Sequence, residues 1–276
     1  MITRRDFLKV TGVAAAAAAL TACGGSASST ASSTASSAAS SEAASTSAAA
    51  ELTTVEAGKL TMATNAAFPP YEMTTDAGEF EGIDIDTAKA IAEKLGLELQ
   101  IDDMDFDAAL LSVQQGKADI VMAGVTVTDE RKAVMDFSDS YATGIQSIIV
   151  PEGSDITSPD DLAGKKIGTQ RGTTGYIYCS DDFGDDAVVA YDDGLTAVQA
   201  LNNGQVDAVV IDNAPAKEFV AANPGLVILD TSYAEEDYAI GLAKGSALED
   251  AVNAALEELK ADGTLQSIVD KYITAE

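Results

Sequence analysis

Two segments of this chain follow the same pattern, and this repeat constrains the fold more than any other feature. They are Leu110–Gly124 and Val198–Asp212, which align without gaps at an offset of 88 residues, each preceded by an apolar run, at Lys59–Thr64 and Lys166–Gln170. Each segment reads as a helix ended by a glycine, followed by an aspartate and an apolar strand. The pattern predicts an α/β fold with two related lobes. The alternative is a chance match, because helix–glycine–strand units are common in α/β proteins.

The strand ends of the two predicted lobes indicate where a ligand would bind. In open α/β sheets, ligands bind beyond the carboxyl ends of the strands. Here those ends are Gly124–Thr126 in one lobe and Asp212 in the other. Two such ends facing each other would form a cleft, which favours a binding protein that closes on its ligand. A helix is also expected at Thr87–Leu95, with Asp86 as its N-cap and Gly96 as its stop.

Residues 1–22 have the features of an export signal. Arg4, Arg5 and Lys9 precede an apolar run at Val10–Leu20, as in a secretory signal peptide. The run is too short to cross a bilayer, which takes about 20 apolar residues. The arginine pair followed by Phe-Leu-Lys resembles a twin-arginine signal, although export by the general secretory route is left open.

The residues around Cys23 predict a lipid anchor and a tether. Leu20-Thr21-Ala22-Cys23 resembles the lipobox of bacterial lipoproteins, which implies cleavage before Cys23 and lipidation of its sulfur. The alternative is an ordinary secretory signal with an incidental cysteine. Residues 24–50 are almost only Ser, Ala, Thr and Gly, a composition that buries too little apolar surface to offset its ordering entropy. We therefore expect a disordered linker over 23–57 and a folded part held at the outer face of the cytoplasmic membrane.

Charge and composition argue against several functional classes. The formal net charge is −29, and the chain has no histidine. So acidic a surface repels nucleic acid, and the lack of histidine removes the commonest general base and transition-metal ligand. Apart from Cys23 the chain has one cysteine, Cys179, which we expect to be a small residue within a helix. No catalytic residue, metal site or cofactor is predicted.

A series of motifs follows in order along the folded part. They are Thr64–Glu72, Gly82–Asp86, Met104–Asp107, Ala123–Lys132, Asp136–Asp139, Gly172–Gly175 and Ala261–Thr264. Together they resemble the bacterial extracellular solute-binding proteins of family 3, the polar amino-acid-binding proteins of ABC importers. The resemblance covers Lys59 to Ile273 and implies a Venus-flytrap fold, with two mixed-sheet lobes joined by a two-strand hinge and no enzymatic activity. Lobe 1 would comprise 58–142 plus 238–276, and lobe 2 would comprise 143–237, with hinges near Tyr141–Gln146 and Glu235–Ala239.

The resemblance also implies which residues hold the ligand. Arg131 would clamp the α-carboxylate, whose two oxygens suit the guanidinium fork, and Asp212 would hold the α-ammonium. The other implied contacts are Gly124 and Thr126 beside the ammonium, Phe68 and Phe106 beside the side chain, Asn65, and Gln170, Thr173 and Thr174 from lobe 2. From the residues alone, Arg131 reads better as a helix-surface residue and Asp212 as an N-cap. The two phenylalanines read equally well as core residues.

Two features of the sequence point to different ligands. Relatives that bind arginine, lysine or histidine commonly carry an aspartate where this chain has Asn65, so a neutral polar amino acid is favoured. Against this, Asp212-Asn213-Ala214 followed by Lys217–Val220 looks like arginine-binding members. The expected partners are a polar L-amino acid and an ABC permease with its ATPase. Contact with the membrane is expected through the lipid anchor only, and the protein is expected to be a monomer.

Two further functions are compatible with this fold. Cyclohexadienyl dehydratases share it, so the fold alone does not exclude catalysis, and Asp212 would be the obvious acid or base. The other reading is a sensor component that presents its ligand to a membrane receptor.

Overall fold

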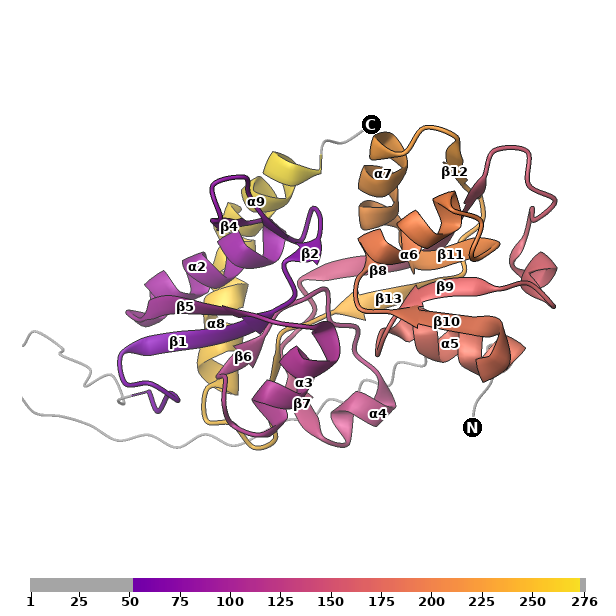
Figure 1. Ribbon diagram of the computed structural model, residues 1–276. Coiled ribbons are helices and arrows are strands. Elements are labelled where there is room, and N and C mark those ends of the chain that lie inside the picture. The colour runs from indigo at the N-terminus through magenta and orange to yellow at the C-terminus, as the bar shows by residue number, and fades with distance from the viewer. Residues whose placement is uncertain (1–51, 274–276) are drawn as a thin grey trace, which may run out of the picture. The chain divides into compact units, whose positions relative to one another are not determined.

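The computed structural model describes residues 52–273, which fall within one compact unit. The predicted export signal, Cys23 and most of the predicted linker lie outside the described residues. Figure 1 shows the helices and strands of the described part as two α/β lobes, each built around its own sheet.

The sheet of the first lobe has the strand order β5-β1-β6-β14-β7. Its strands are β1 (Lys59–Thr64), β5 (Glu98–Asp103), β6 (Ile120–Val121), β7 (Met135–Phe137) and β14 (Gly241–Ala243). β1 runs parallel to β5 and β6, whereas β14 is antiparallel to its neighbours. Alternate residues of β1 supply two cores, because Leu60 and Met62 pack on one face and Ala63 on the other.

Helices cover both faces of this sheet (Figure 1). α2 (Ile83–Leu95), α8 (Glu249–Ala261) and α9 (Thr264–Tyr272) pack together over the core that contains Leu60 and Met62. α3 (Phe106–Gln114) packs over the other face, where Phe106 and Val113 join Ala63. A small sheet of β2 (Ala67–Phe68), β3 (Glu72–Thr74) and β4 (Phe80–Glu81) lies between β1 and α2 in the chain. It brings the side chain of Phe68 to the edge of the lobe that carries the site.

The sheet of the second lobe has the order β10-β9-β11-β8-β12, and β13 pairs with β8. Its strands are β8 (Ala142–Pro151), β9 (Ile167–Gln170), β10 (Val188–Tyr191), β11 (Ala208–Asp212), β12 (Leu226–Ile228) and β13 (Ala234–Tyr238). α5 (Thr174–Phe183) packs on one face beside Val210, whereas α6 (Gly194–Asn202) and α7 (Asn213–Ala222) pack on the other beside Val209 and Ile211. The chain passes between the sheets twice, from β7 to β8 and from β13 to β14.

The two repeated units use the same backbone contacts. Gly116 and Gly204 both have a left-handed backbone, with φ of 66° and 67°, as a glycine that ends a helix requires. The Asp119 carboxylate accepts a bond of 2.8 Å from the backbone N–H of Thr61, and Asp207 accepts one of 2.7 Å from Lys166. Each aspartate thus ties the start of its strand to the start of a parallel neighbour in the same sheet, β1 in the first lobe and β9 in the second.

Two expected boundaries are wrong. α2 begins at Ile83, not Thr87, and its N-cap is Gly82. Gly82 has φ of 135°, and a Cβ there would collide with the carbonyl of Tyr71, so only glycine fits this start. The folded part also begins before Lys59, because Leu52 packs against the core and the N–H of Val55 donates to Asp119 at 2.7 Å. The predicted linker therefore extends too far toward the C-terminus.

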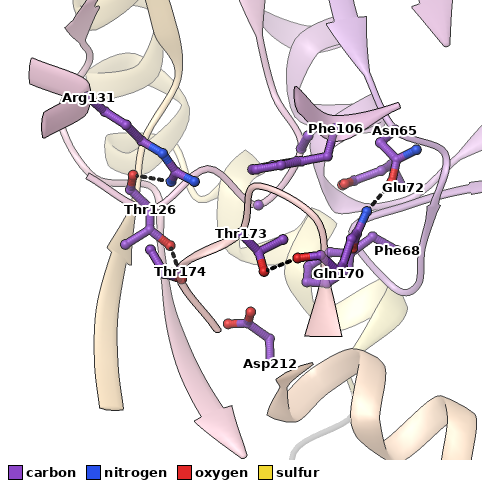
Figure 2. Close-up of a pocket in the computed structure, with 12 residues that line it drawn as sticks. Asn65, Phe68, Glu72, Phe106, Thr126, Arg131, Gln170, Thr173, Thr174 and Asp212 are labelled. Carbon is purple, nitrogen blue, oxygen red and sulfur yellow. Dashed lines mark hydrogen bonds between the residues drawn. The ribbon is translucent and has the colours of Figure 1, made fainter. Parts of the chain in front are cut away.

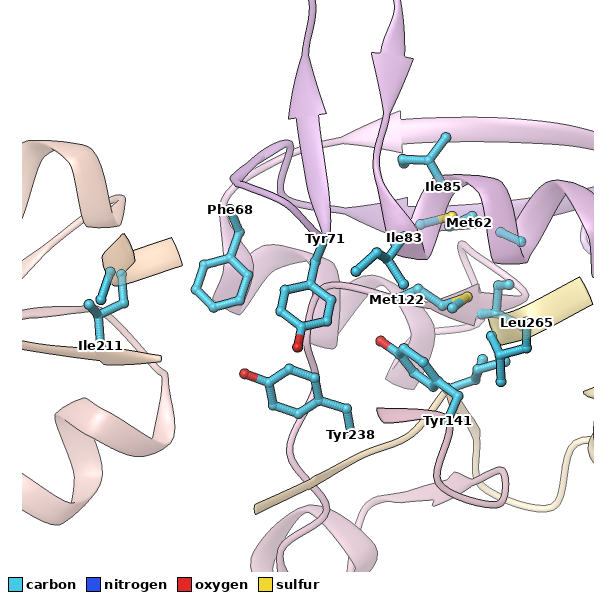
Figure 3. Close-up of a cluster of buried hydrophobic side chains, with 14 of the residues drawn as sticks. Met62, Phe68, Tyr71, Ile83, Ile85, Met122, Tyr141, Ile211, Tyr238 and Leu265 are labelled. Atoms are coloured by element: carbon cyan, nitrogen blue, oxygen red, sulfur yellow. The ribbon is translucent and has the colours of Figure 1, made fainter. Parts of the chain in front are cut away.

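One apolar cluster continues from lobe to lobe. Tyr71 stacks on Phe68 at 5.9 Å between ring centroids and meets Tyr238 edge-on at 5.2 Å. Figure 3 shows these rings between Ile211 of the second lobe and Met62 of the first. Packed aromatic side chains therefore lie where the two lobes meet.

Candidate functional site

All ten predicted ligand-binding residues line one cavity between the two sheets (Figure 2). They are Asn65, Phe68, Phe106, Gly124, Thr126, Arg131, Gln170, Thr173, Thr174 and Asp212, and Glu72 and Ala123 complete the wall. Many of these residues stand at or just beyond the carboxyl ends of β1, β6, β9 and β11. The cavity therefore lies where the strand ends predict it.

Arg131 is a buried cation, not a surface residue. It lies in the short helix α4 (Asp129–Lys132), and only 8% of it is exposed. Its Nη1 donates to the carbonyl of Thr126 at 2.7 Å, and its Nη2 donates to the carbonyl of Gly172 in the other lobe at 3.1 Å. The guanidinium also lies 5.4 Å from the centre of the Phe106 ring, a cation–π distance. Burial lowers the pKa of Arg131, and the charge of Glu236 partly offsets this.

Asp212 is a buried carboxyl at the start of α7. It occupies the N-cap position, but its side chain makes no capping bond. Instead, Oδ2 accepts from Nε2 of Gln146 at 2.7 Å, and Oδ1 accepts from the hydroxyl of Tyr238. Burial raises the pKa of Asp212 to about 7, and the charge of Glu236 adds to the effect. A buried carboxyl of this kind gains from a cation placed beside it.

The amide of Asn65 is already engaged by both lobes. Its Nδ2 donates to the carbonyl of Met104 at 2.9 Å, and its Oδ1 accepts from Nε2 of Gln170 at 2.8 Å. The second contact crosses the cavity, as Figure 2 shows. Asn65 therefore joins the lobes as well as lining the cavity, and one lone pair of its oxygen is left for a ligand.

The three threonines that line the cavity make different hydrogen bonds. Thr173 caps α5 by accepting from the N–H of Tyr176, and its hydroxyl donates to the carbonyl of Gln170 at 2.8 Å. Thr126 and Thr174 come from different lobes, with 3.5 Å between their hydroxyl oxygens. Thr173 thus shapes the loop, whereas the other two hydroxyls meet beside Arg131.

The residue-by-residue sequence reading missed three acids. Glu72 lines the cavity and lies within the motif Thr64–Glu72, of which only Asn65 and Phe68 are predicted to contact the ligand. Burial and the neighbouring Asp84 raise the pKa of Glu72 well above its usual range. Asp84 accepts from the N–H of Gly124 at 2.9 Å and so holds this cavity-lining loop, and burial raises its pKa to about 6. Glu236 lies behind the wall, within the predicted hinge segment.

Cys179 behaves as expected for a small core residue. It is buried in α5, and burial raises the pKa of its thiol to about 12. A thiol held in its neutral form is a poor nucleophile.

Comparisons with known proteins agree with this geometry. The sequence profile of bacterial extracellular solute-binding proteins, family 3, matches residues 60–275, and that of the twin-arginine translocation pathway signal sequence matches residues 1–21. The L-cystine-binding protein TcyJ of Escherichia coli is 33% identical over 226 residues, which cover 80% of this chain and 85% of that protein.

Solved structures are also similar. The arginine-, lysine-, histidine-binding protein ArtJ of Geobacillus stearothermophilus has a TM-score of 0.76 at 34% identity, covering 79% of this chain and 96% of that one. An ancestral arginine-binding protein bound to glutamine has a TM-score of 0.75 at 43% identity, covering 79% and 99%. Within residues 52–273, no helix combines the length and apolar character needed to cross a membrane.

Proposed function

The chain belongs to the bacterial extracellular solute-binding proteins of family 3, and we propose that it captures a polar L-amino acid between its two lobes and delivers it to an ABC importer. The observation that carries the proposal is that a buried guanidinium and a buried carboxyl both line the same cavity. Arg131 suits the carboxylate of an amino acid, and Asp212 suits its ammonium group. The relatives are named as binding proteins, which favours binding over the dehydratase alternative.

A thermal-shift screen tests this function. The full chain, with Cys23→Ser so that it is not lipidated, is heated with each common L-amino acid and with cystine. A ligand that binds only the folded state stabilises it by about 2.7 kcal/mol at a hundredfold excess over Kd. We expect one amino acid, or a small related group, to raise Tm. If none does, the proposal fails, and turnover of prephenate or arogenate becomes the next assay.

The side chain of the ligand faces two groups that suggest different cargoes. Asn65 carries no charge and favours a neutral polar side chain, which is our first candidate. Glu72 favours a second candidate, a cationic side chain, because it is a buried carboxyl on the cavity wall whose hydrogen-bonded neighbour is a second acid, Asp84. A cation would stabilise the ionised form of the acid.

Glu72→Gln separates the two candidates. The substitution keeps the shape of the side chain and removes its acidity. For a cationic cargo we expect affinity for L-arginine to fall about tenfold, since a hydrogen bond to a charged group contributes about 1.5–3 kcal/mol. Titration calorimetry with L-arginine and L-glutamine measures both affinities, and the exposed Glu79→Gln is the matched control. An unchanged ratio of the two affinities would leave the neutral candidate.

We also propose that the protein is held at the outer face of the cytoplasmic membrane by a lipid on Cys23, that 23–51 tether it there, and that it acts as a monomer. The two passages between the sheets would serve as the hinge between lobe 1 (52–142 plus 238–276) and lobe 2 (143–237). The signal-sequence match at residues 1–21 supports export.

Fractionation of cells tests the anchor. The wild-type chain is expected in the membrane fraction, and Cys23→Ser is expected to move the exported protein into the soluble fraction. Cys179→Ser, which changes the buried cysteine instead, should leave it with the membrane. Retention of the Cys23→Ser protein by the membrane would exclude a lipid on this residue.

A further inference from the structure

Glu236 collects hydrogen bonds from both lobes on a single oxygen. It is a buried residue of β13, outside the cavity wall. Its Oε2 lies 3.1 Å from the Thr126 hydroxyl of the first lobe, and 2.9 Å from the Thr174 hydroxyl and 3.0 Å from Nε2 of Gln146 in the second. Oε2 of this carboxylate therefore contacts three polar side chains, two of which line the cavity. Tyr178 of α5 is a further neighbour, because burial and then the charge of Glu236 raise the pKa of its hydroxyl.

The backbone holds Glu236 against the Thr126 loop. Val127 donates its N–H to the carbonyl of Asp237 at 3.0 Å, and Ala239 donates to the carbonyl of Val125 at 3.1 Å. Thr126 also forms an isolated bridge with Tyr238. The loop thus runs beside β13 like a short extra strand, which places the Thr126 hydroxyl within reach of Glu236.

These contacts decide which way the Thr126 hydroxyl is turned. The Thr126 hydroxyl donates to Oε2 of Glu236, and a hydroxyl has only one hydrogen, with two lone pairs. The hydrogen of Thr126 is therefore committed to Glu236. What Thr126 offers the cavity is a lone pair, which can accept a hydrogen bond but not donate one.

An ammonium group bound beside Asp212 would need a second acceptor, and Thr126 lies on the same cavity wall. Asp212 lies on the same cavity, and Gln146 connects it to Glu236 through bonds from one nitrogen to both carboxylates, at 2.7 and 3.0 Å. An ammonium group carries three hydrogens, so one carboxylate leaves some of its donors unpaired. A correctly turned Thr126 provides a second acceptor.

We propose that Glu236 is a positioning residue, which fixes the Thr126 hydroxyl as an acceptor so that Thr126 and Asp212 together hold the ammonium group of the ligand. This rests on the proposed amino-acid binding. Glu236 itself does not touch the ligand. It acts through Thr126, and it acts only when the lobes are together, since its partners come from both.

A double-mutant cycle tests the proposal. Glu236→Gln and Thr126→Val are each expected to weaken binding about tenfold. At pH 8, where Asp212 is largely ionised with or without the charge of Glu236, the double variant should bind no more weakly than Thr126→Val alone, because Glu236 acts through that hydroxyl. The probe is whichever of L-arginine, L-glutamine and L-cystine gives the largest Tm shift with the full Cys23→Ser chain, and affinities come from titration calorimetry. Glu235→Gln, the exposed neighbour on the same strand, is the control and should bind as the parent does.

The other outcomes are distinct. If Glu236→Gln tightens binding, then Glu236 competes with the ligand carboxylate for the hydrogen-bond donors of the protein, and the proposal is overturned. If the two losses multiply in the double variant, Glu236 does not act through Thr126, and the proposal is equally overturned. Should Glu236→Gln not fold, Glu236→Asp takes its place in the cycle, since it keeps the charge but draws the oxygen away from Thr126. Failure of the parent chain to bind any of the three probes would instead remove the premise of amino-acid binding.

Discussion

Arg131→Ala is expected to weaken amino-acid binding by at least about a hundredfold. Two charge-assisted bonds to a carboxylate contribute about 1.5–3 kcal/mol each, and a 1.4 kcal/mol loss is a factor of ten in affinity. The substitution also removes the bond to Gly172 that joins Arg131 to the other lobe. Titration calorimetry with the best ligand of the thermal-shift screen measures the loss.

Two control variants test whether the shape of the guanidinium and its position in the chain matter, or only a positive charge. Arg131→Lys keeps a positive charge but loses the planar fork, so we expect an intermediate loss of affinity. Lys132→Ala removes the exposed cation next in the chain and should leave the affinity unchanged. Binding by Arg131→Ala within about threefold of the parent would show that another group holds the carboxylate.

Asp212→Asn is expected to remove both most of the affinity and most of its dependence on pH. In the ligand-free protein burial raises the pKa of Asp212 to about 7, so the carboxyl is largely protonated at pH 6. A bound ammonium group favours the ionised form and lowers that pKa, so binding must release a proton. Affinity should therefore rise with pH and level off above about 7, and below that it should fall roughly tenfold per pH unit.

Calorimetry at pH 6 in two buffers of different ionisation enthalpy measures this proton release. The parent chain is expected to release nearly one proton per ligand. Asp84 titrates in the same range, with a pKa of about 6, so only the part of the release that Asp212→Asn removes belongs to Asp212. Asp230→Asn, an exposed acid of the same lobe, is the control. Equal proton release by the parent and by Asp212→Asn would mean that Asp212 does not face the ammonium group.

The two predictions share one physical cause, which is burial without full compensation. Arg131 and Asp212 are both buried, and each lacks an oppositely charged partner within hydrogen-bonding distance among the described residues. A zwitterion brings both missing charges at once. Pairing each group with an opposite charge offsets the free-energy cost of its burial.

Much of this protein can be read from its sequence without the structure. The repeat at an offset of 88 residues predicts the two α/β units. In each unit a glycine ends the helix and an aspartate bonds the neighbouring strand, and both are local requirements of that unit. Motif order brings together ten residues that do line one cavity. The first residues likewise predict an export signal, because their basic and apolar pattern needs no tertiary partner, and the profile of a twin-arginine signal sequence matches residues 1–21.

Other features were decided only by tertiary structure. Whether Arg131 is a surface residue or a buried clamp depends on Gly172 and Phe106, which are distant in the chain. The start of α2 was misplaced because Tyr71 packs against Gly82, a contact that helix-capping preferences do not describe. Glu72 and Glu236 look like ordinary acids in the sequence. The importance of Glu72 comes from its desolvation beside Asp84. That of Glu236 comes from hydrogen-bond partners supplied by both lobes, which come together only in the folded chain.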